Sequence, residues 1–507
     1  MAFSVSPSVI VREVDASASV PAIATPPAAI AGVYRWGPVG EAVLVSSENE
    51  LVSRFGTPTD DNYETFFVAA DYLSYANALY VARVDNGAVT ASTTDTSNAN
   101  TSLHVFGSFD AKYPGALGNS LEVACVRGDK FAEVIIDAGD IPASKIAGNT
   151  QISQTVTFNQ TANLVFEVAP SNRITVADVN VGDVFRIGND SVGFQEVSVE
   201  AITETALDSA GDETANTVLT TAYSYEVDFG GAYRLPESDL NKLSIERKWQ
   251  YAGTFGKKPA DANYHIAVID EDGDISGEAG TILELYSDVS VSPTAKLSSG
   301  KTNYYREVIE QDSSWVVVAN TTHFEAQTTQ YASIGDAVVG TDGRSESAAT
   351  LGDLAAGYDL FKSSNEIDVS FVLGGKSDDT GNVATYLISN IADYRKDAIA
   401  FISPAKSDVV DESKTEAKLA NVIAFKNSLP SSSYYVMDSG YKYRYDRYND
   451  VYRYTPLNGD IAGCASRVEP FESPAGFRKG VIKNVVKLAF NPNKAQRDQL
   501  YSAEVNP

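Results

Sequence analysis

Residues 367–437 read IDVSFVLGGKSDDTGNVATYLISNIADYRKDAIAFISPAKSDVVDESKTEAKLANVIAFKNSLPSSSYYVM, and this stretch decides the fold class. Its apolar runs at residues 367–373, 398–402 and 434–437 predict three short buried strands. A helical pattern separates each strand from the next, and the connecting turns are short. Strands that alternate with helices in this way indicate a parallel sheet with right-handed crossovers.

The two helices between these strands are predicted from capping and periodicity. Ser413 with Glu416 three residues later has the spacing of a capping box, and Pro430 would end the helix that it opens. Apolar residues at helical spacing should face the core: Val383, Leu387, Ile391 and Tyr394 in the first helix, and Leu419, Val422 and Ile423 in the second.

The beginning of the chain carries a second block of the same kind. Residues 29–34, 41–45 and 79–84 are expected to be strands. Asp61 with Glu64 predicts a capping box that opens a helix through Ala76. The predicted fold class is therefore α+β multidomain, with an α/β sheet core built from the N- and C-terminal parts of the chain and β-rich domains inserted between them.

Strand patterns dominate the middle of the chain. The Thr-, Val- and Asn-rich part between Ile141 and Leu243 has turn signals about every 8 to 12 residues, which suggests a small β-barrel or sandwich. The expected organisation is an extended arm (1–28), a first core part (29–90), a β-rich middle domain (91–140 and 244–350), an inserted, outward-projecting β-barrel or sandwich (141–243), and a second core part (351–507).

Composition excludes several classes of protein. The 507 residues have a net charge of −28, with 43% hydrophobic residues, so cores can form but a cationic footprint for nucleic acid or anionic membranes is missing. The negative charge leads us to expect no nucleic-acid partner. We also expect no membrane insertion, because no run of about 18 apolar residues is present. The start of the chain has no basic, apolar leader pattern, so a secretory signal is not expected.

The residue types that most often carry chemistry are scattered. His104, His265 and His323 lie far apart, and none has a partner at metal-ligand spacing. Cys125 and Cys464 occur in unrelated segments and are expected to be buried thiols. We therefore predict no catalytic, cofactor-binding or metal-binding residues, and no enzyme activity.

Two short motifs imitate ligand sites. Gly374-Gly375-Lys376-Ser377 ends like a phosphate loop, but Ser370 stands where the first glycine belongs, so a strand-to-helix turn is the better interpretation. The acidic run that starts at Asp270 resembles the start of a calcium loop but has Ile275 at the sharp-turn glycine position. A hairpin tip is expected there.

Residues 441–454, YKYRYDRYNDVYRY, alternate tyrosines with charged residues. Tyrosines and arginines could stack bases and neutralise phosphates. In an acidic chain we favour an amphipathic strand or loop whose tyrosines pack while the arginines pair with Asp446 and Asp450. A basic, aromatic patch would also suit docking of another acidic copy. The candidate assembly patch comprises Tyr441, Tyr443, Arg444, Tyr445, Arg447 and Arg453.

The first residues of the chain are expected to form an extended arm. Phe3, Val5, Val9 and Val11 occupy odd positions, the period of a strand, and prolines exclude a helix. Such a strand either pairs within its own sheet or adds to the sheet of a neighbouring subunit.

Several motifs in this order resemble one known family. Residues 30–59, IAGVYRWGPVGEAVLVSSENELVSRFGTPT, residues 113–119, YPGALGN, and residues 441–507 with SPAGFRKGVIKNVVKLAF and AQRDQLYSAEVNP are similar to the tail sheath proteins of contractile-tailed, myovirus-type bacteriophages. The residues matched to family motifs are Trp36, Gly37, Pro38, Phe55, Gly56, Pro114, Gly115, Pro474, Gly476, Gly480 and Arg497.

The resemblance implies a structural subunit that polymerises as helical rings and contracts, with no bond chemistry. Its implied partners are other copies of itself, the tail tube protein, and baseplate and tail terminator proteins. The subunit would be assembled in the host cytoplasm and reside in the virion. The family continues beyond Asn506-Pro507, so we expect this chain to lack the family's C-terminal domain and to polymerise poorly. Alternatives are the sheath of a phage-derived contractile injection system, or an acidic β-rich glycan-binding protein or hydrolase.

Overall fold

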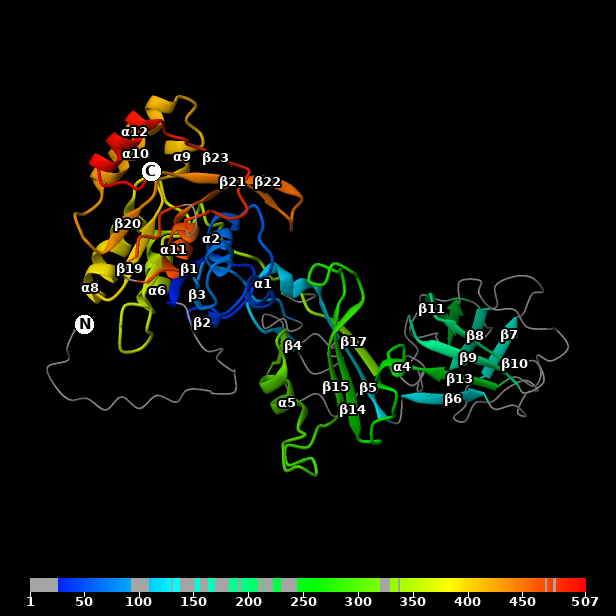
Figure 1. Cartoon of the computed structure of the whole chain (residues 1–507). Coiled ribbons are helices and arrows are strands. Elements are labelled where there is room, and N and C mark those ends of the chain that lie inside the picture. Colours follow the sequence, from blue (N-terminus) through cyan, green and yellow to red (C-terminus); the bar gives the residue numbers. More distant parts are fainter. Residues whose placement is uncertain are drawn as a thin grey trace. The chain divides into compact units, whose positions relative to one another are not determined.

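The computed structural model describes residues 26–92, 109–128, 131–136, 151–155, 163–168, 182–189, 193–207, 213, 222–228, 244–319, 329–335, 338–469, 472–476 and 480–507. The chain divides into two compact units (Figure 1). Unit 1 comprises Met1–Ala91, Tyr113–Asn119 and Val339–Pro507, and unit 2 comprises Ser92–Lys112 and Ser120–Val338.

Unit 1 is built on a six-stranded sheet to which both ends of the chain contribute. The two central strands, β1 and β18, pair in parallel, with Ala28 opposite Phe371. All other pairs are parallel as well, except that β2 runs antiparallel to β3. The strand order is β2 (Ala42–Val45), β3 (Leu79–Arg83), β1 (Ala28–Gly32), β18 (Phe371–Leu373), β19 (Ile399–Ile402) and β20 (Tyr435–Met437).

Helices cover both faces of this sheet. On one face Ile30 and Phe401 share a core with α1, α2 and α11, whereas Val372 and Ala400 point to the opposite face. The helical elements of unit 1 are α1 (Glu48–Phe55), α2 (Tyr63–Leu73), α6 (Leu351–Asp359), α7 (Asn382–Tyr386), the π-helical η6 (Leu387–Ala392), α8 (Asp393–Arg395), α9 (Lys406–Val409), α10 (Thr415–Ser428), α11 (Asn458–Ser466) and α12 (Lys494–Ser502).

Unit 2 consists mainly of antiparallel strands. Its strands form the sheets β15-β14-β5-β17, β10-β9-β13-β6 and β11-β12-β8-β7, and the pair β16-β4. The elements are β4 (Phe109–Ala111), β5 (Leu121–Arg127), β6 (Ala132–Ile136), β7 (Gln151–Thr155), β8 (Asn163–Val168), β9 (Val184–Asn189), β10 (Gly193–Ser198), β11 (Ala201–Leu207), β12 (Ala222–Asp228), β13 (Ser244–Lys248), β14 (Asn263–Asp270), β15 (Thr281–Ser290), β16 (Val316–Val318), β17 (Thr329–Ser333), α4 (Ala252–Phe255) and α5 (Tyr305–Asp312).

The mixed α/β class is confirmed, and so are several local predictions. Residues 374–381 connect β18 to α7, so the glycine-rich motif is a strand-to-helix turn. Asp270 ends β14 and accepts hydrogen bonds from the backbone N–H groups of Ile275 (3.1 Å) and Ser276 (2.6 Å) at the tip of the β14–β15 hairpin. Cys125 and Cys464 are buried free thiols.

Both predicted capping boxes are wrong. Helix α2 begins at Tyr63 after Asn62, whose side chain caps nothing. Instead the carboxylate of Glu346 accepts hydrogen bonds from the backbone N–H groups of Glu64 (3.0 Å) and Thr65 (3.1 Å). A distant carboxylate thus replaces the local cap at the positive end of the helix. Helix α10 likewise begins at Thr415, one residue later than a Ser413 cap requires, and has no side-chain cap.

One predicted core position is also wrong. Val383, Leu387 and Ile391 are buried as expected, but Tyr394 is 64% exposed. The helix widens to a π-turn in η6, and the extra residue per turn rotates the following positions away from the core. The α-helical spacing used for the prediction therefore fails after Ile391.

Some of the residues singled out in the sequence lie outside the described part of the chain. His104, His323 and the arm positions Phe3, Val5, Val9 and Val11 lie outside the described residues. His265 is a buried strand residue whose Nδ1 accepts a hydrogen bond from the Asp288 backbone N–H (3.0 Å). In the described part of the chain no helix is long and apolar enough to cross a bilayer.

Candidate assembly surface

The tyrosine-rich segment forms a β-hairpin in unit 1. Strands β21 (Tyr441–Asp446) and β22 (Val451–Pro456) pair antiparallel, and β23 (Lys487–Leu488) pairs with the other side of β21 (Figure 1). Asp450 closes the turn with a φ of 54°, a left-handed conformation that aspartate tolerates better than most residues. Within the described residues, the outer edge of β22 has no further strand beside it.

One face of the hairpin buries charged side chains. Lys442 is completely buried, and its Nζ forms ion pairs with Asp71 Oδ2 of α2 (2.9 Å) and Asp460 Oδ2 of α11 (2.7 Å). Arg444 pairs with the same Asp71, and its guanidinium carbon lies 4.1 Å from the centre of the Phe67 ring. Two carboxylates on two helices therefore surround the inward cations of β21.

The carboxylates of this buried charge network influence one another. Tyr75 donates a hydrogen bond to Asp460 Oδ1 (3.0 Å) and accepts one from the Lys483 backbone N–H (2.7 Å). Burial and the neighbouring Asp71 raise the pKa of Asp460 to about 7, although Lys442 opposes the shift. The network consequently joins helix α2 near the start of the chain to three segments near its end.

A second pairing on the same face closes the hairpin tip. Asp446 is completely buried and accepts a hydrogen bond from Arg453 Nε (2.8 Å) and another from the Tyr448 backbone N–H (2.9 Å). Arg453 also pairs with Asp60 (2.6 Å). The pairing of Arg453 with Asp446 agrees with the sequence-based interpretation, whereas Asp450, the second carboxylate expected to pair with an arginine, accepts a hydrogen bond from the Tyr445 hydroxyl.

The opposite face of the hairpin carries the tyrosines. The rings of Tyr443 and Tyr454 lie 4.7 Å apart, and those of Tyr445 and Tyr452 lie 5.2 Å apart. Tyr445 and Tyr452 are 46% and 55% exposed, whereas Tyr441 at the base is buried and donates a hydrogen bond to the Pro404 carbonyl (3.1 Å). The aromatic face thus runs from the core at the base to solvent at the tip.

The six residues of the candidate patch are separated by this arrangement. Tyr445 and Arg447 are exposed, Tyr443 and Arg453 are half-buried, and Tyr441 and Arg444 are buried. Tyr441 and Arg444 cannot belong to an exposed patch of the folded chain, because both contact the core. Exposed Arg447 pairs with Glu48 (3.3 Å) of α1, so its charge is partly matched within the chain.

Sequence reasoning missed an exposed apolar row next to the hairpin. Val481, Val485, Val486 and Leu488, in and before β23, are between 39% and 63% exposed. The alternation of valines with lysines over residues 481–488 was an available signal. Exposed Tyr445 and Tyr452 form the candidate assembly surface, whereas Leu488 is paired opposite Lys442 and therefore points to the other face of the sheet.

The first group of family-motif residues lies inside unit 1 and shapes a turn. Trp36 is buried, its ring lies 5.5 Å from that of Tyr113, and its backbone N–H donates to the Phe55 carbonyl (3.2 Å). Gly37 has a φ of 97°, and a Cβ there would lie 2.7 Å from a backbone oxygen. Gly115 is equally confined at φ 145°. The neighbouring motif residues are Pro38, which is half-buried, Gly56, which ends α1, and Pro114, which is half-buried.

The second group of motif residues is more exposed. The Gly480 backbone N–H donates to the Gly476 carbonyl (2.9 Å), and exposed Pro474 lies in the same loop. Arg497 is an exposed residue of α12. The motif positions therefore include both internal supports and surface residues.

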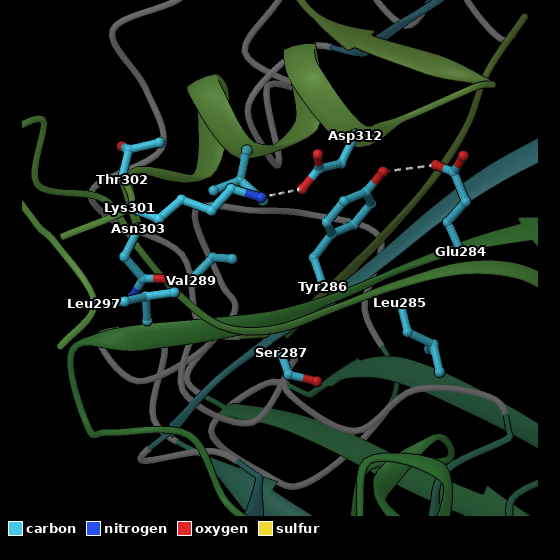
Figure 2. Close-up of a pocket in the computed structure, with 11 residues that line it drawn as sticks. Glu284, Leu285, Tyr286, Ser287, Val289, Leu297, Lys301, Thr302, Asn303 and Asp312 are labelled. Atoms are coloured by element: carbon cyan, nitrogen blue, oxygen red, sulfur yellow. Dashed lines mark hydrogen bonds and ion pairs between the residues drawn. The ribbon is translucent and has the colours of Figure 1, made fainter. Parts of the chain in front are cut away.

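Unit 2 contains a separate hollow of about 440 Å³ beside β15 and α5 (Figure 2). Tyr286 donates a hydrogen bond to Glu284 (2.8 Å), and Lys301 pairs with Asp312 (3.0 Å) across the lining. These polar groups satisfy one another, so the hollow shows no arrangement that suggests a ligand.

Asp438, which follows β20, connects the sheet to the hairpin. Its carboxylate accepts hydrogen bonds from the Ser403 hydroxyl (2.7 Å) and the Gly440 backbone N–H (2.9 Å), and the side chain is buried. Burial raises the pKa of Asp438 to about 7, and nearby Asp460 adds to the shift.

This raised pKa predicts a pH-dependent stability. Because the folded pKa exceeds the unfolded one, the contribution of Asp438 is present at pH 4 and is lost as the pH rises through 7. The free energy of unfolding should therefore fall by about 2–3 kcal/mol more in the wild type than in Asp438→Asn between pH 5 and pH 8. Urea unfolding at both pH values measures the difference. Asp261→Asn, at a highly exposed carboxylate, is the control, and equal pH slopes for all three chains would contradict the assignment.

Comparison with known proteins gives this surface a context. Residues 27–84 match the family model described as tail sheath protein Gp18 domain III N-terminal region. The chain is 25% identical to the tail sheath protein of Vibrio phage KVP40, over 99% of the chain and 80% of that protein. It is 27% identical to the tail sheath protein of Enterobacteria phage T4, over 99% of the chain and 79% of that protein.

Solved structures give a weaker similarity. The sheath tail protein from Desulfitobacterium hafniense aligns with a TM-score of 0.41 at 11% identity, over 98% of this chain and 70% of that one. The sheath tail protein from Listeria innocua aligns with a TM-score of 0.46 at 10% identity, over 95% and 64%. Along almost its whole length, the chain is therefore similar in sequence to the tail sheath proteins of bacteriophages.

Proposed function

We propose that this chain is a structural subunit of a contractile phage tail sheath, which polymerises as helical rings around the tail tube and contracts to drive the tube through the host envelope. The observation that carries the proposal is similarity over 99% of the chain to proteins named tail sheath protein. The partners would be other copies of the chain, the tube, and baseplate and terminator proteins. Assembly would take place in the host cytoplasm, and the function requires no catalysis.

The candidate assembly surface supports self-association as the central activity. Exposed Tyr445 and Tyr452 lie on a hairpin whose base is fixed to the core of unit 1, and exposed aliphatic residues such as Val486 lie in the segment beside it. Aromatic and aliphatic side chains of this kind are enriched at the centres of protein interfaces. We assign a second copy of the chain to this surface, and the arm of a neighbour as a donated strand.

The proposed contraction uses these two types of contact differently. Subunits would move as nearly rigid bodies, because a packed α/β core does not deform continuously. Main-chain pairing of a donated arm tolerates rotation better than packed side chains do, so arms would keep neighbours connected. A difference of about a few kcal/mol at each interface, repeated over many copies, would supply the energy that drives contraction.

Gold-labelled antibody against the chain, viewed by electron microscopy on particles from its source, tests the proposal. Labels repeated along the whole tail, in extended and contracted particles alike, are the expected result. Labels confined to fibres, baseplate or capsid would overturn it.

The insertion at residues 141–243 is proposed to project outward, where its removal costs least. Strands β6 and β13 border the insertion in sequence and pair antiparallel with Ile136 opposite Ile245, so their ends lie within reach of a tight turn, although β13 also pairs with β9 of the insertion. Replacing residues 137–244 by Asn-Gly should close a hairpin with a two-residue turn and leave polymer formation unchanged. Electron microscopy of the polymers is the measurement. If the shortened chain folds but does not assemble, the insertion belongs to an interface.

A further inference from the structure

We propose that the buried charge network of Asp71, Lys442, Arg444 and Asp460 selects which face of the β21–β22 hairpin packs on α2, and thereby presents the tyrosines to a partner. The network is a positioning device and takes no part in binding itself. Only its consequence for assembly rests on the proposed function. The orientation of the hairpin stands independently of it.

The starting observation is that the hairpin is inverted relative to an ordinary amphipathic sheet. In β21 the even positions Lys442, Arg444 and Asp446 are buried, whereas Tyr445 is exposed and Tyr443 half-buried. Hydrophobic burial alone favours the opposite arrangement, with tyrosines on the core and charges in water. Something other than apolar area therefore determines the observed face.

The residues that receive the hairpin supply that determinant. Asp71 is 1% exposed and Asp460 is completely buried, and both lie on helices under β21. If the tyrosine face were turned inward, Lys442 and Arg444 would point to solvent. The carboxylates of Asp71 and Asp460 would then remain buried without a cation. A buried carboxylate that loses its cation must either stay ionised at a high cost or take up a proton and lose the ion pair, so the two carboxylates disfavour the alternative orientation.

The geometry shows that the cations are matched to this one arrangement. Lys442 Nζ lies within ion-pair distance of both carboxylates, and also donates to the Lys483 carbonyl (3.0 Å). Arg444 pairs with Asp71 while covering the Phe67 ring. Because strand residues alternate between faces, these contacts force positions 443 and 445 to the other side.

The test removes the charges while keeping the side-chain volumes. In the full chain, Asp71→Asn, Lys442→Met, Arg444→Met and Asp460→Asn are combined, and urea unfolding establishes that the variant folds. Tyrosine nitration with peptide mapping then reports the presented face. The wild type should be nitrated at Tyr445 and Tyr452 and protected at Tyr441. In the variant, nitration at Tyr445 should fall by about twofold or more, because two orientations share the population.

Control variants separate orientation from stability. The pair Glu48→Gln with Arg447→Met neutralises an ion pair at the surface of the same hairpin; both residues also contact the Tyr448 hydroxyl, so the control is read at Tyr445 and Tyr452, whose nitration should stay unchanged. Lys442→Arg with Arg444→Lys keeps both charges and should also retain it. If the fourfold variant does not fold, Lys442→Met with Asp460→Asn, which leaves the Arg444–Asp71 pair intact, decides the question.

The outcomes for orientation and for assembly are independent. A folded neutral variant with the wild-type nitration pattern would overturn the proposal. Altered nitration together with loss of polymers is the expected result. Altered nitration with normal polymers would support the orientation mechanism and would instead refute the tyrosine face as an assembly surface.

Discussion

Removing residues 2–25 should abolish the ordered polymers that the chain forms, however few, while leaving unit 1 folded. The alternation of Phe3, Val5, Val9 and Val11 predicts a strand that a neighbouring sheet receives, and its loss removes a row of main-chain hydrogen bonds at every subunit contact. The deletion stops before Pro26 and Pro27, because Tyr72 donates to the Pro26 carbonyl (2.5 Å) and the Ser370 backbone N–H donates to that of Pro27 (2.8 Å). Electron microscopy scores polymers, and urea unfolding scores the fold.

A substitution series makes this test specific to the apolar face of the arm. Serine at the four apolar positions should reproduce the deletion, whereas asparagine at Ser4, Ser6 and Ser8 should preserve assembly, because only one face of a strand would be buried. Ordered tubes from the deleted chain would show that the arm is dispensable.

The central sheet was predictable because its strands are marked locally. Residues 28–32 and 79–83 are almost wholly apolar, and parallel strands covered on both faces require such runs. Strand-helix alternation then gave the direction of the strands. The joining of β1 to β18 is a long-range pairing, but both strands could be recognised without knowledge of the partner.

The face of the hairpin was not predictable in the same way. Alternation of tyrosines with charged residues shows that β21 has two different faces, and it does not show which is buried. The answer depends on Asp71, which precedes β21 by hundreds of residues, and on Asp460 in the following helix. The cap of α2 also comes from a distant residue. The Glu346 carboxylate accepts the hydrogen bond of the Glu64 backbone N–H, although the two residues are 282 positions apart in the chain. Tertiary partners thus decided the features that local patterns left open.

Gly459→Ala should be among the most destabilising single substitutions in unit 1. Helix α11 packs closely on α2, and a Cβ at Gly459 would lie 2.3 Å from the Val68 carbonyl oxygen. Backbone cannot move aside as a side-chain tip does, so the two helices must separate. We expect a loss of about 3 kcal/mol in the free energy of unfolding, the upper range for overpacking. Gly352→Ala in α6 is the matched control, because its Cβ would meet nothing closer than 3.6 Å, and it should stabilise by up to about 1 kcal/mol.

The same substitution also probes the hairpin, because α2 and α11 carry the two buried carboxylates. Separating these helices moves Asp71 away from Asp460, and Lys442 Nζ can no longer lie 2.9 Å and 2.7 Å from both. Gly459→Ala should therefore lower nitration of Tyr445 as well as stability, whereas Gly352→Ala should change stability alone. A destabilised Gly459→Ala chain with wild-type nitration would mean that Lys442 needs only one of its two carboxylates to hold the tyrosine face outward.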